Sequence, residues 1–164
     1  DLLTFTPGTE GGDIRTAQQY GSFELRLQWR VAPGGNSGIM LHGVCEVQVL
    51  DSFENDTYPD GQAAAIYSNY PPLVNASRPA GEWQVYDIVF TAPKLEGSKV
   101  VEPAYITTFV NGICVQNHTK IMGPTKHKNV TDYSGEFPEK APIRIQDHKN
   151  EPPVRLRNVW IRPL

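Results

Sequence analysis

Arg144, Gln146 and His148 share one parity within the segment 143–148, opposite the apolar residues Ile143 and Ile145. Because side chains alternate across a strand, these three would project from one face of it. A cation, an amide and an imidazole side by side suit a site that holds an oxyanion and moves a proton. The alternative is a solvent-exposed strand face on which a histidine happens to neighbour an arginine.

Glu46 and Gln48 form a second polar stripe, on the strand expected over 45–50. Asp51 has the opposite parity to Glu46, so these two are poorly placed as the paired carboxylates that flank the scissile bond in an ordinary glycosidase. Glu46 is therefore a candidate acid or base without a carboxylate partner. The alternative is again a solvated strand face.

Other candidate residues carry weaker signals. Strand 154–162 changes parity at Arg157, so we expect a β-bulge at Arg157 and Asn158, which would either re-aim the Arg157 side chain or reflect edge-strand twist. The remaining histidines are interpreted as surface or loop residues because they show no metal-ligand spacing with one another or with carboxylates; they are His42, His118 and His127. No catalytic metal is predicted.

The elements that must position these residues are strands. Fourteen prolines and fourteen glycines leave few stretches for a long helix, and we expect less than about 15% helix. Asn111-Gly112 predicts a type I′ hairpin turn, and segment 13–20 is left open between helix and loop. Alternation and turn residues predict an antiparallel two-sheet sandwich or jelly roll, with strands over 22–31, 37–42, 45–50, 62–67, 83–90, 105–110, 113–117, 143–148 and 154–162.

Composition narrows the class of protein. The chain of 164 residues is long enough for one domain, and its net charge of −3 argues against a nucleic-acid binder, whose surface carries a basic stripe. No apolar run approaches the roughly 20 residues of a membrane span. Cys45 and Cys114 are interpreted as two buried thiols, with one disulfide as the alternative.

An ordered series of motifs resembles the 3-keto-disaccharide hydrolase family, a former domain of unknown function. The resemblance runs from about residue 11 to residue 164 and is specific as a series, although each piece is short. The motifs are YGSFEL at 20–25, GNSGI at 35–39, EVQVLDS at 46–52, DGQAAAIY at 60–67, PAGEWQ at 79–84, NG at 111–112, IQDH at 145–148 and VRLRNVWI at 154–161. Cys45 departs from the pattern, because the family commonly has an aromatic residue there.

The resemblance implies an all-β fold, a concanavalin A-like jelly roll of two antiparallel sheets, as a single domain over 1–164 that lacks part of the family's N-terminal segment. It implies a carbohydrate substrate, usually outside the bacterial cytoplasm, in the periplasm or the extracellular space. It implies no cofactor, although structural calcium occurs in folds of this type. The oligomeric state is left open.

The resemblance also implies a reaction. Family members are thought to cleave glycosides already oxidised at C3, which needs one base, one acid and an oxyanion clamp. Glu46 and His148 are then the catalytic pair, with the split of base and acid between them left open. The expected substrate-binding residues are Asn36, Gln48, Tyr67, Trp83, Arg144, Gln146 and Arg157. The alternative function is a non-catalytic carbohydrate-binding module of a larger secreted protein.

Overall fold

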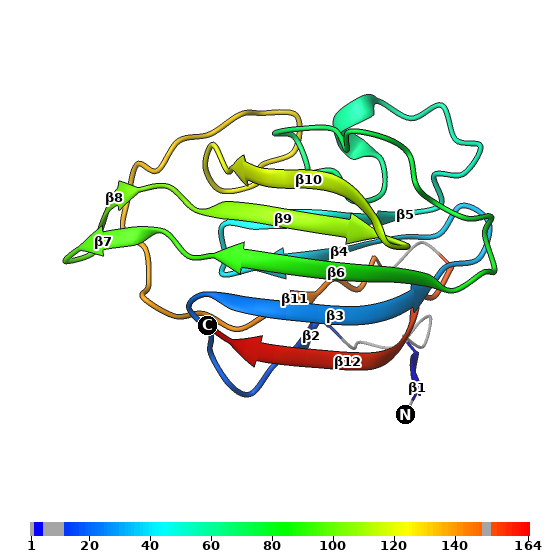
Figure 1. Cartoon of the computed structure of the whole chain (residues 1–164), viewed down its shortest axis with the longest axis horizontal. Coiled ribbons are helices and arrows are strands. Elements are labelled where there is room, and N and C mark those ends of the chain that lie inside the picture. Colours follow the sequence, from blue (N-terminus) through cyan, green and yellow to red (C-terminus); the bar gives the residue numbers. More distant parts are fainter. Residues whose placement is uncertain (1, 5–11, 149–151) are drawn as a thin grey trace.

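The computed structural model describes residues 2–4, 12–148 and 152–164, and within them the chain is an antiparallel β-sandwich (Figure 1). The six-stranded sheet has the order β1-β12-β3-β6-β9-β10, the four-stranded sheet the order β2-β11-β4-β5, and a separate hairpin pairs β7 with β8. The strands are β1 (Leu2–Thr4), β2 (Ile14–Arg15), β3 (Phe23–Arg30), β4 (Asn36–Leu41), β5 (Cys45–Leu50), β6 (Gln84–Thr91), β7 (Lys94–Glu96), β8 (Lys99–Glu102), β9 (Tyr105–Val110), β10 (Ile113–Lys120), β11 (Arg144–Ile145) and β12 (Arg155–Pro163). The expected all-β class is confirmed.

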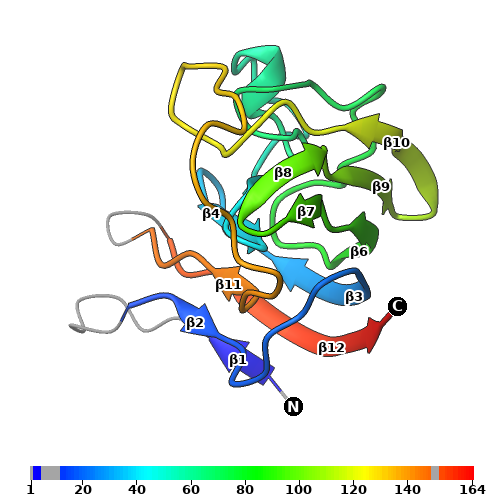
Figure 2. The same cartoon turned by 90° about the vertical axis from the view of Figure 1, so that its left-hand side faces the viewer.

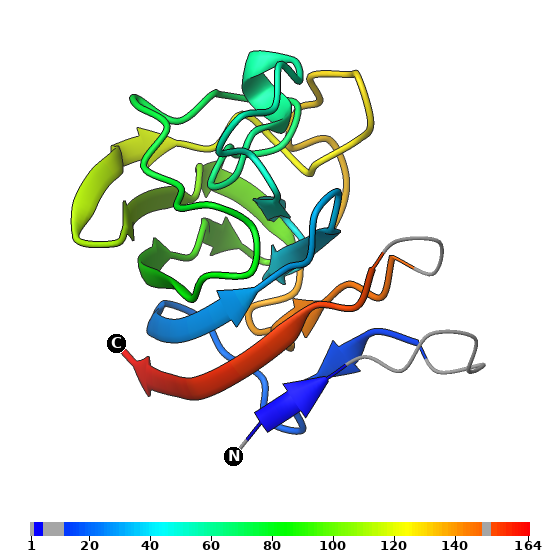
Figure 3. The ribbon, with the colours of Figure 1, turned by 90° about the vertical axis from the view of Figure 1, so that its right-hand side faces the viewer.

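The core lies between the two sheets, which Figures 2 and 3 show from their edges. β3 contributes four residues that are at most 1% exposed, Phe23, Leu25, Leu27 and Trp29. They are the residues of one face of the strand. From the facing sheet, β4 and β5 send in their own apolar residues, among them Ile39, Leu41, Val47 and Val49. Each sheet therefore turns its remaining parity outward, and the polar stripe of β5 belongs to that outer side.

Two local predictions about turns and bulges are confirmed. Asn111 and Gly112 have φ values of 54° and 85°, as the hairpin between β9 and β10 requires. In β12 the register with β3 shifts between Arg157 and Trp160, and Asn158 has a φ of 51°. Asn tolerates this left-handed conformation better than most residues, which explains its place in the bulge.

The strand predicted over 62–67 is wrong. Ala63–Ala65 are buried, but the chain turns at Ala64, whose φ is 63°, and only Ile66 forms an isolated bridge to β5. A single 3-10 turn, η1 (Pro59–Gly61), precedes this segment. The segment still forms a backbone hydrogen bond with the edge strand β5, because the amide of Ala64 donates to the Gln48 carbonyl at 2.9 Å. Small buried side chains thus mark a close loop here and not a strand.

The cysteine and histidine interpretations are corrected in part. Both Cys45 and Cys114 are free thiols, but Cys114 is only half-buried. His42, predicted at the surface, is 1% exposed in the turn between β4 and β5, and its Nε2 lies 3.1 Å from the Glu139 carbonyl oxygen. Its ring packs beside Phe90, which accounts for its burial.

Candidate active site

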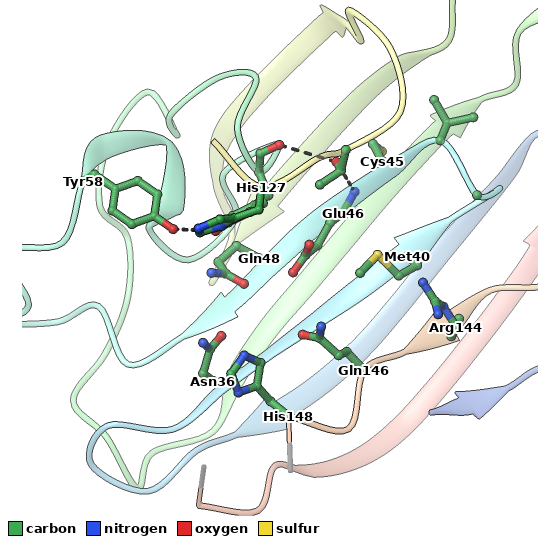
Figure 4. Close-up of a pocket in the computed structure, with 14 residues that line it drawn as sticks. Asn36, Met40, Cys45, Glu46, Gln48, Tyr58, His127, Arg144, Gln146 and His148 are labelled. Carbon is green, nitrogen blue, oxygen red and sulfur yellow. Dashed lines mark hydrogen bonds between the residues drawn. The ribbon is translucent and has the colours of Figure 1, made fainter. Parts of the chain in front are cut away.

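A cavity of about 340 Å³ lies on the outer face of the four-stranded sheet (Figure 4). Glu46 and Gln48 of β5 form its floor together with Met40 of β4. On one side stands a wall that we call the basic wall, made by Asn36, Arg144, Gln146 and His148. On the other side loops after β5 and β10 supply a second wall, here the phenol wall, made by Tyr58, Tyr67 and His127. The parity argument is confirmed in its geometry, because Glu46, Gln48, Gln146 and His148 line one cavity.

Glu46 is 7% exposed, and its carboxylate lies directly over Gly38 of the neighbouring strand. A Cβ atom at residue 38 would overlap Oε1 of Glu46, so glycine is what makes room for the acid. The amide of Glu46 donates to Oγ1 of Thr125 at 2.9 Å, which ties β5 to the loop after β10. The position of Glu46 therefore depends on the absence of a side chain at Gly38 and on the hydrogen bond from its amide to Thr125.

Burial raises the pKa of Glu46 to about 7, although the positive charge of Arg144 lowers it. The two effects oppose each other, and loss of hydration is the larger. At neutral pH this carboxyl group is thus near the midpoint of its titration, the range in which a side chain can both take and return a proton.

An ion pair with Asp13 positions Arg144. Its Nη1 lies 2.8 Å from Oδ2 of Asp13, and the other oxygen of Asp13 accepts from the amide of Asp147 at 2.9 Å. Asp13 immediately precedes β2, the edge strand that pairs with β11. One carboxylate thus connects the edge of the sheet to both ends of the short segment that carries the basic wall.

Gln146 and His148 follow β11, where the ladder has ended but the chain is still attached to β4. The amide of Gln146 donates to the Gly38 carbonyl at 2.8 Å, and the Ser37 hydroxyl donates to the Gln146 carbonyl at 2.8 Å. These bonds keep the parity of the strand at Gln146, one residue past its end. His148 is exposed at the mouth of the cavity, with Asn36 and Gln146 beside it in Figure 4.

Gln48 lines the cavity, and its amide oxygen is buried. Its Nε2 donates to the Gly61 carbonyl at 3.2 Å, while its Oε1 has no hydrogen-bond partner among the described residues, although the side chain is only 5% exposed. A buried amide oxygen without a partner costs free energy unless something bound in the cavity donates to it. A sugar hydroxyl is a donor of the right kind.

In the phenol wall, hydrogen bonds connect two tyrosine hydroxyl groups and one histidine ring nitrogen. The Tyr67 hydroxyl lies 2.6 Å from the Tyr58 hydroxyl and 2.6 Å from Nδ1 of His127. The Tyr67 and His127 rings are stacked with centroids 6.0 Å apart. Sequence reasoning identified Tyr67 but missed Tyr58 and His127, because loop residues have no periodicity that would assign them to a face.

Trp83 and Arg157 lie outside this cavity. The Arg157 guanidinium stacks 4.0 Å above the Trp83 ring, and its Nε donates to Oε1 of Gln28 on the outer side of the six-stranded sheet at 2.6 Å. Arg30 approaches the same indole at 4.9 Å. Of the nine residues predicted for the site, the structure brings seven together and places these two on another face.

Residues 2–4, 12–148 and 152–164 show neither a metal-ligand cluster nor a membrane-spanning helix. In that part of the chain, no three His, Cys, Asp or Glu side chains are grouped so as to hold a metal ion. None of its helices is both long enough and apolar enough to pass through a bilayer.

The family model described as a 3-keto-alpha-glucoside-1,2-lyase-like domain matches residues 2–162. The chain belongs to this family. It is 31% identical to the 3-keto-disaccharide hydrolase of Bacteroides thetaiotaomicron over 45% of this chain, and it spans about a third of that relative's length, 34%.

Solved structures agree with the fold. A "putative glycosyl hydrolase" from Parabacteroides distasonis is 37% identical, with a TM-score of 0.91 over 99% of this chain and 72% of its own. A second protein of the same description and organism is 22% identical, with a TM-score of 0.72 over 99% of this chain and 87% of its own. The latter likeness concerns the fold alone.

Proposed function

We propose that this protein cleaves glycosides whose sugar carries a ketone at C3, by elimination across C1 and C2 followed by addition of water. The observation that carries the proposal is Glu46, a buried carboxyl group with a pKa raised to about 7. Among the described residues that line the cavity it is the one carboxylate. Direct displacement at an unoxidised glycoside ordinarily uses two opposed carboxylates. Elimination needs only one base.

The first step is removal of a proton by Glu46. A ketone at C3 makes the hydrogen on C2 acidic, and the Glu46 carboxylate takes it while the electron pair of the C2–H bond forms an enolate. Negative charge then develops on the C3 oxygen. Arg144 and Gln146 of the basic wall supply a cation and an amide donor for this oxyanion, and His148 donates to it as the acid. Glu46 is the base in this assignment.

The second step breaks the glycosidic bond. As the C3 ketone re-forms, a double bond forms between C1 and C2, and the electron pair of the C1–O bond leaves with the aglycone oxygen, which takes up a proton. Water then adds its oxygen to C1 and releases one proton to solvent, which balances the proton taken up by the aglycone. Glu46, whose carboxyl proton exchanges with solvent in the meantime, returns a proton to C2. The net reaction is hydrolysis to a 3-keto sugar and an alcohol.

The remaining polar residues bind the sugar. Oε1 of Gln48 has no partner among the described residues, and it would accept from one hydroxyl. Asn36 lies beside His148 at the mouth and offers both a donor and an acceptor. Family membership and the names of the relatives support carbohydrate as the substrate class.

The test compares one 3-keto-glucoside with its unoxidised parent glucoside, using the whole chain at neutral pH. We expect release of the alcohol from the ketone alone, with solvent deuterium appearing at C2 when the reaction runs in D2O. Equal release from the parent would contradict the elimination mechanism. Binding of the ketone without release would instead favour a carbohydrate-binding module.

A further inference from the structure

The elimination leaves one group without a donor, because the departing aglycone oxygen must receive a proton. C1 and C3 are the two ring neighbours of C2, so their substituents extend to opposite sides of the base that attacks C2. With the C3 oxygen on the basic wall, the leaving oxygen faces the opposite side of Glu46. That side is the phenol wall (Figure 4).

We propose that Tyr67 is the acid that protonates the leaving oxygen, and that His127 resupplies its proton from solvent. This inference rests on the proposed function and adds a catalytic residue to it. In the step, the Tyr67 O–H bond breaks as the leaving oxygen takes the proton, and the phenolate oxygen then takes the Nδ1 proton of His127. Nε2 of the same ring takes a proton from solvent as Nδ1 gives up its own, so the imidazole ends the step neutral.

The hydrogen bonds around Tyr67 fit this role. A phenol oxygen can accept two hydrogen bonds and donate one. Tyr58 and His127 both lie 2.6 Å from the Tyr67 oxygen, so with both donating, Tyr67 has its own O–H left for the substrate. Two donors also stabilise the phenolate that forms when the proton leaves.

The electrostatics of the cavity keep Tyr67 protonated before the reaction. Burial raises the pKa of Tyr67, and the charge of Glu46 raises it further. The charge of Glu46 affects the pKa of Tyr67, and both side chains line the same cavity. His127 is exposed, which gives the far end of the relay direct access to water.

The position of the wall is built into the loops that carry it. The Tyr58 ring lies against Gly61 of η1, where a Cβ would overlap the ring, and Thr125 of the loop that carries His127 receives the amide of Glu46 at 2.9 Å. The amide of Tyr67 donates to the Glu46 carbonyl at 3.0 Å. The acid and the base are therefore attached to each other through the backbone.

The experiment uses Tyr67→Phe and two 3-keto-glucosides, one with a sugar alcohol as leaving group and one with 4-nitrophenol. A sugar alkoxide needs protonation and nitrophenolate does not. We expect kcat for the sugar substrate to fall by about 10²–10³-fold, and for the nitrophenyl substrate by less than about fivefold. Deuterium exchange at C2 of the sugar substrate should persist, because proton removal by Glu46 is intact.

Two further variants keep the test interpretable. Tyr105→Phe removes the hydroxyl of a half-buried tyrosine that stacks on His118 and does not line the cavity, and it should leave both rates unchanged. His127→Ala leaves Tyr67 in place and should lower only the rate on the sugar substrate, by about tenfold, so it serves if Tyr67→Phe fails to fold.

The outcomes separate this inference from the function on which it rests. Equal losses on both substrates, or loss of C2 exchange, would show that Tyr67 only positions the sugar and would overturn the inference. An unchanged rate would do the same. If the wild-type chain releases neither alcohol, the proposed function itself fails.

Discussion

The outer faces of the two sheets carry similar polar stripes but use them differently. On the six-stranded sheet two pairs of opposite charges meet, with Arg162 2.7 Å from Glu24 and Arg26 3.4 Å from Asp87. On the four-stranded sheet Glu46 is buried with a pKa raised to about 7, and Oε1 of Gln48 has no partner among the described residues. Satisfied polar groups stabilise a surface, whereas unsatisfied ones at the bottom of a cavity await a ligand.

The loops account for the difference. Segments after β5 and after β10 lie beside the four-stranded sheet (Figure 2), and they contribute Tyr58, Tyr67 and His127 to the lining of the cavity. They withdraw water from Glu46, and the loss of hydration shifts its pKa. On the six-stranded sheet Glu24 also lines a cavity, but its carboxylate is paired with Arg162. The acids of the two faces therefore differ in their surroundings, since one is held in an ion pair and the other is buried.

The largest expected effect separates the two faces by one matched pair of substitutions. Glu46→Gln removes the proposed base and should lower kcat on a 3-keto-glucoside by about 10²–10⁴-fold. Glu24→Gln makes the same change on the six-stranded sheet, where it breaks an exposed ion pair, and should leave kcat within about twofold. Steady-state kinetics on both variants decides. Similar losses of kcat in the two variants would contradict the assignment of different roles to the two sheet faces.

Gly38→Ala should have the next largest effect. The added methyl group occupies the position of the Glu46 carboxylate, so the base must move, and a displacement of this size costs about 10² in kcat. The control is Gly21→Ala, whose methyl group would meet its nearest neighbour, the Glu139 carbonyl oxygen, at 3.7 Å. Full activity in Gly38→Ala would mean that the carboxylate need not lie over residue 38.

The third prediction concerns stability against pH. The pKa of Glu46 is raised from 4.5 to about 7 on folding, so its contribution is complete below pH 4.5 and is lost as pH rises through 7. Ionising it in the folded state costs roughly 3 kcal/mol. We expect Glu46→Gln to raise the free energy of unfolding at pH 8, by up to that amount, and to lose this advantage toward pH 5.

Urea titrations of both variants at several pH values measure this difference. Glu24→Gln should show no comparable gain at pH 8. A pH-independent difference between Glu46→Gln and the wild type would show that burial does not perturb Glu46 as described.

The smallest effect is expected at Arg157. It was a candidate for substrate binding from sequence, but it stacks on Trp83 away from the cavity. Arg157→Ala should change KM by less than about twofold. It should lower the free energy of unfolding by about 0.5–1 kcal/mol, the contribution of a cation–π contact that is still partly in water. A large rise in KM, with stability unchanged, would place substrate on the six-stranded sheet.

Strand parity was sufficient to predict where Glu46, Gln48, Gln146 and His148 lie relative to one another. Alternation is a local rule, and it survives in β5 and beyond β11 because each strand buries its apolar side in the same core. It could not assign Trp83 or Arg157, since parity says which side of a strand a residue takes but not which sheet the strand joins.

The phenol wall was beyond the reach of the pattern for a different reason. Tyr58 and His127 are positioned by single contacts, such as the packing of the Tyr58 ring on Gly61, that leave no period in the sequence. The prediction of a strand over 62–67 was wrong for a similar reason. Ala64 and Ser68 adopt positive φ values, a conformation that the residue types alanine and serine do not predict.

The brevity of β11 has a kinetic consequence. Only Arg144 and Ile145 pair with each neighbouring strand, whereas β3 pairs with β6 through seven residues. Segments held by so few backbone bonds open at lower cost than the strands around them. Such an opening would carry Arg144 and Gln146 away from Glu46 while buried Trp29 stays in place. As denaturant is added, turnover should therefore decline before tryptophan fluorescence changes, and amide protons near 144–146 should exchange ahead of those in β3.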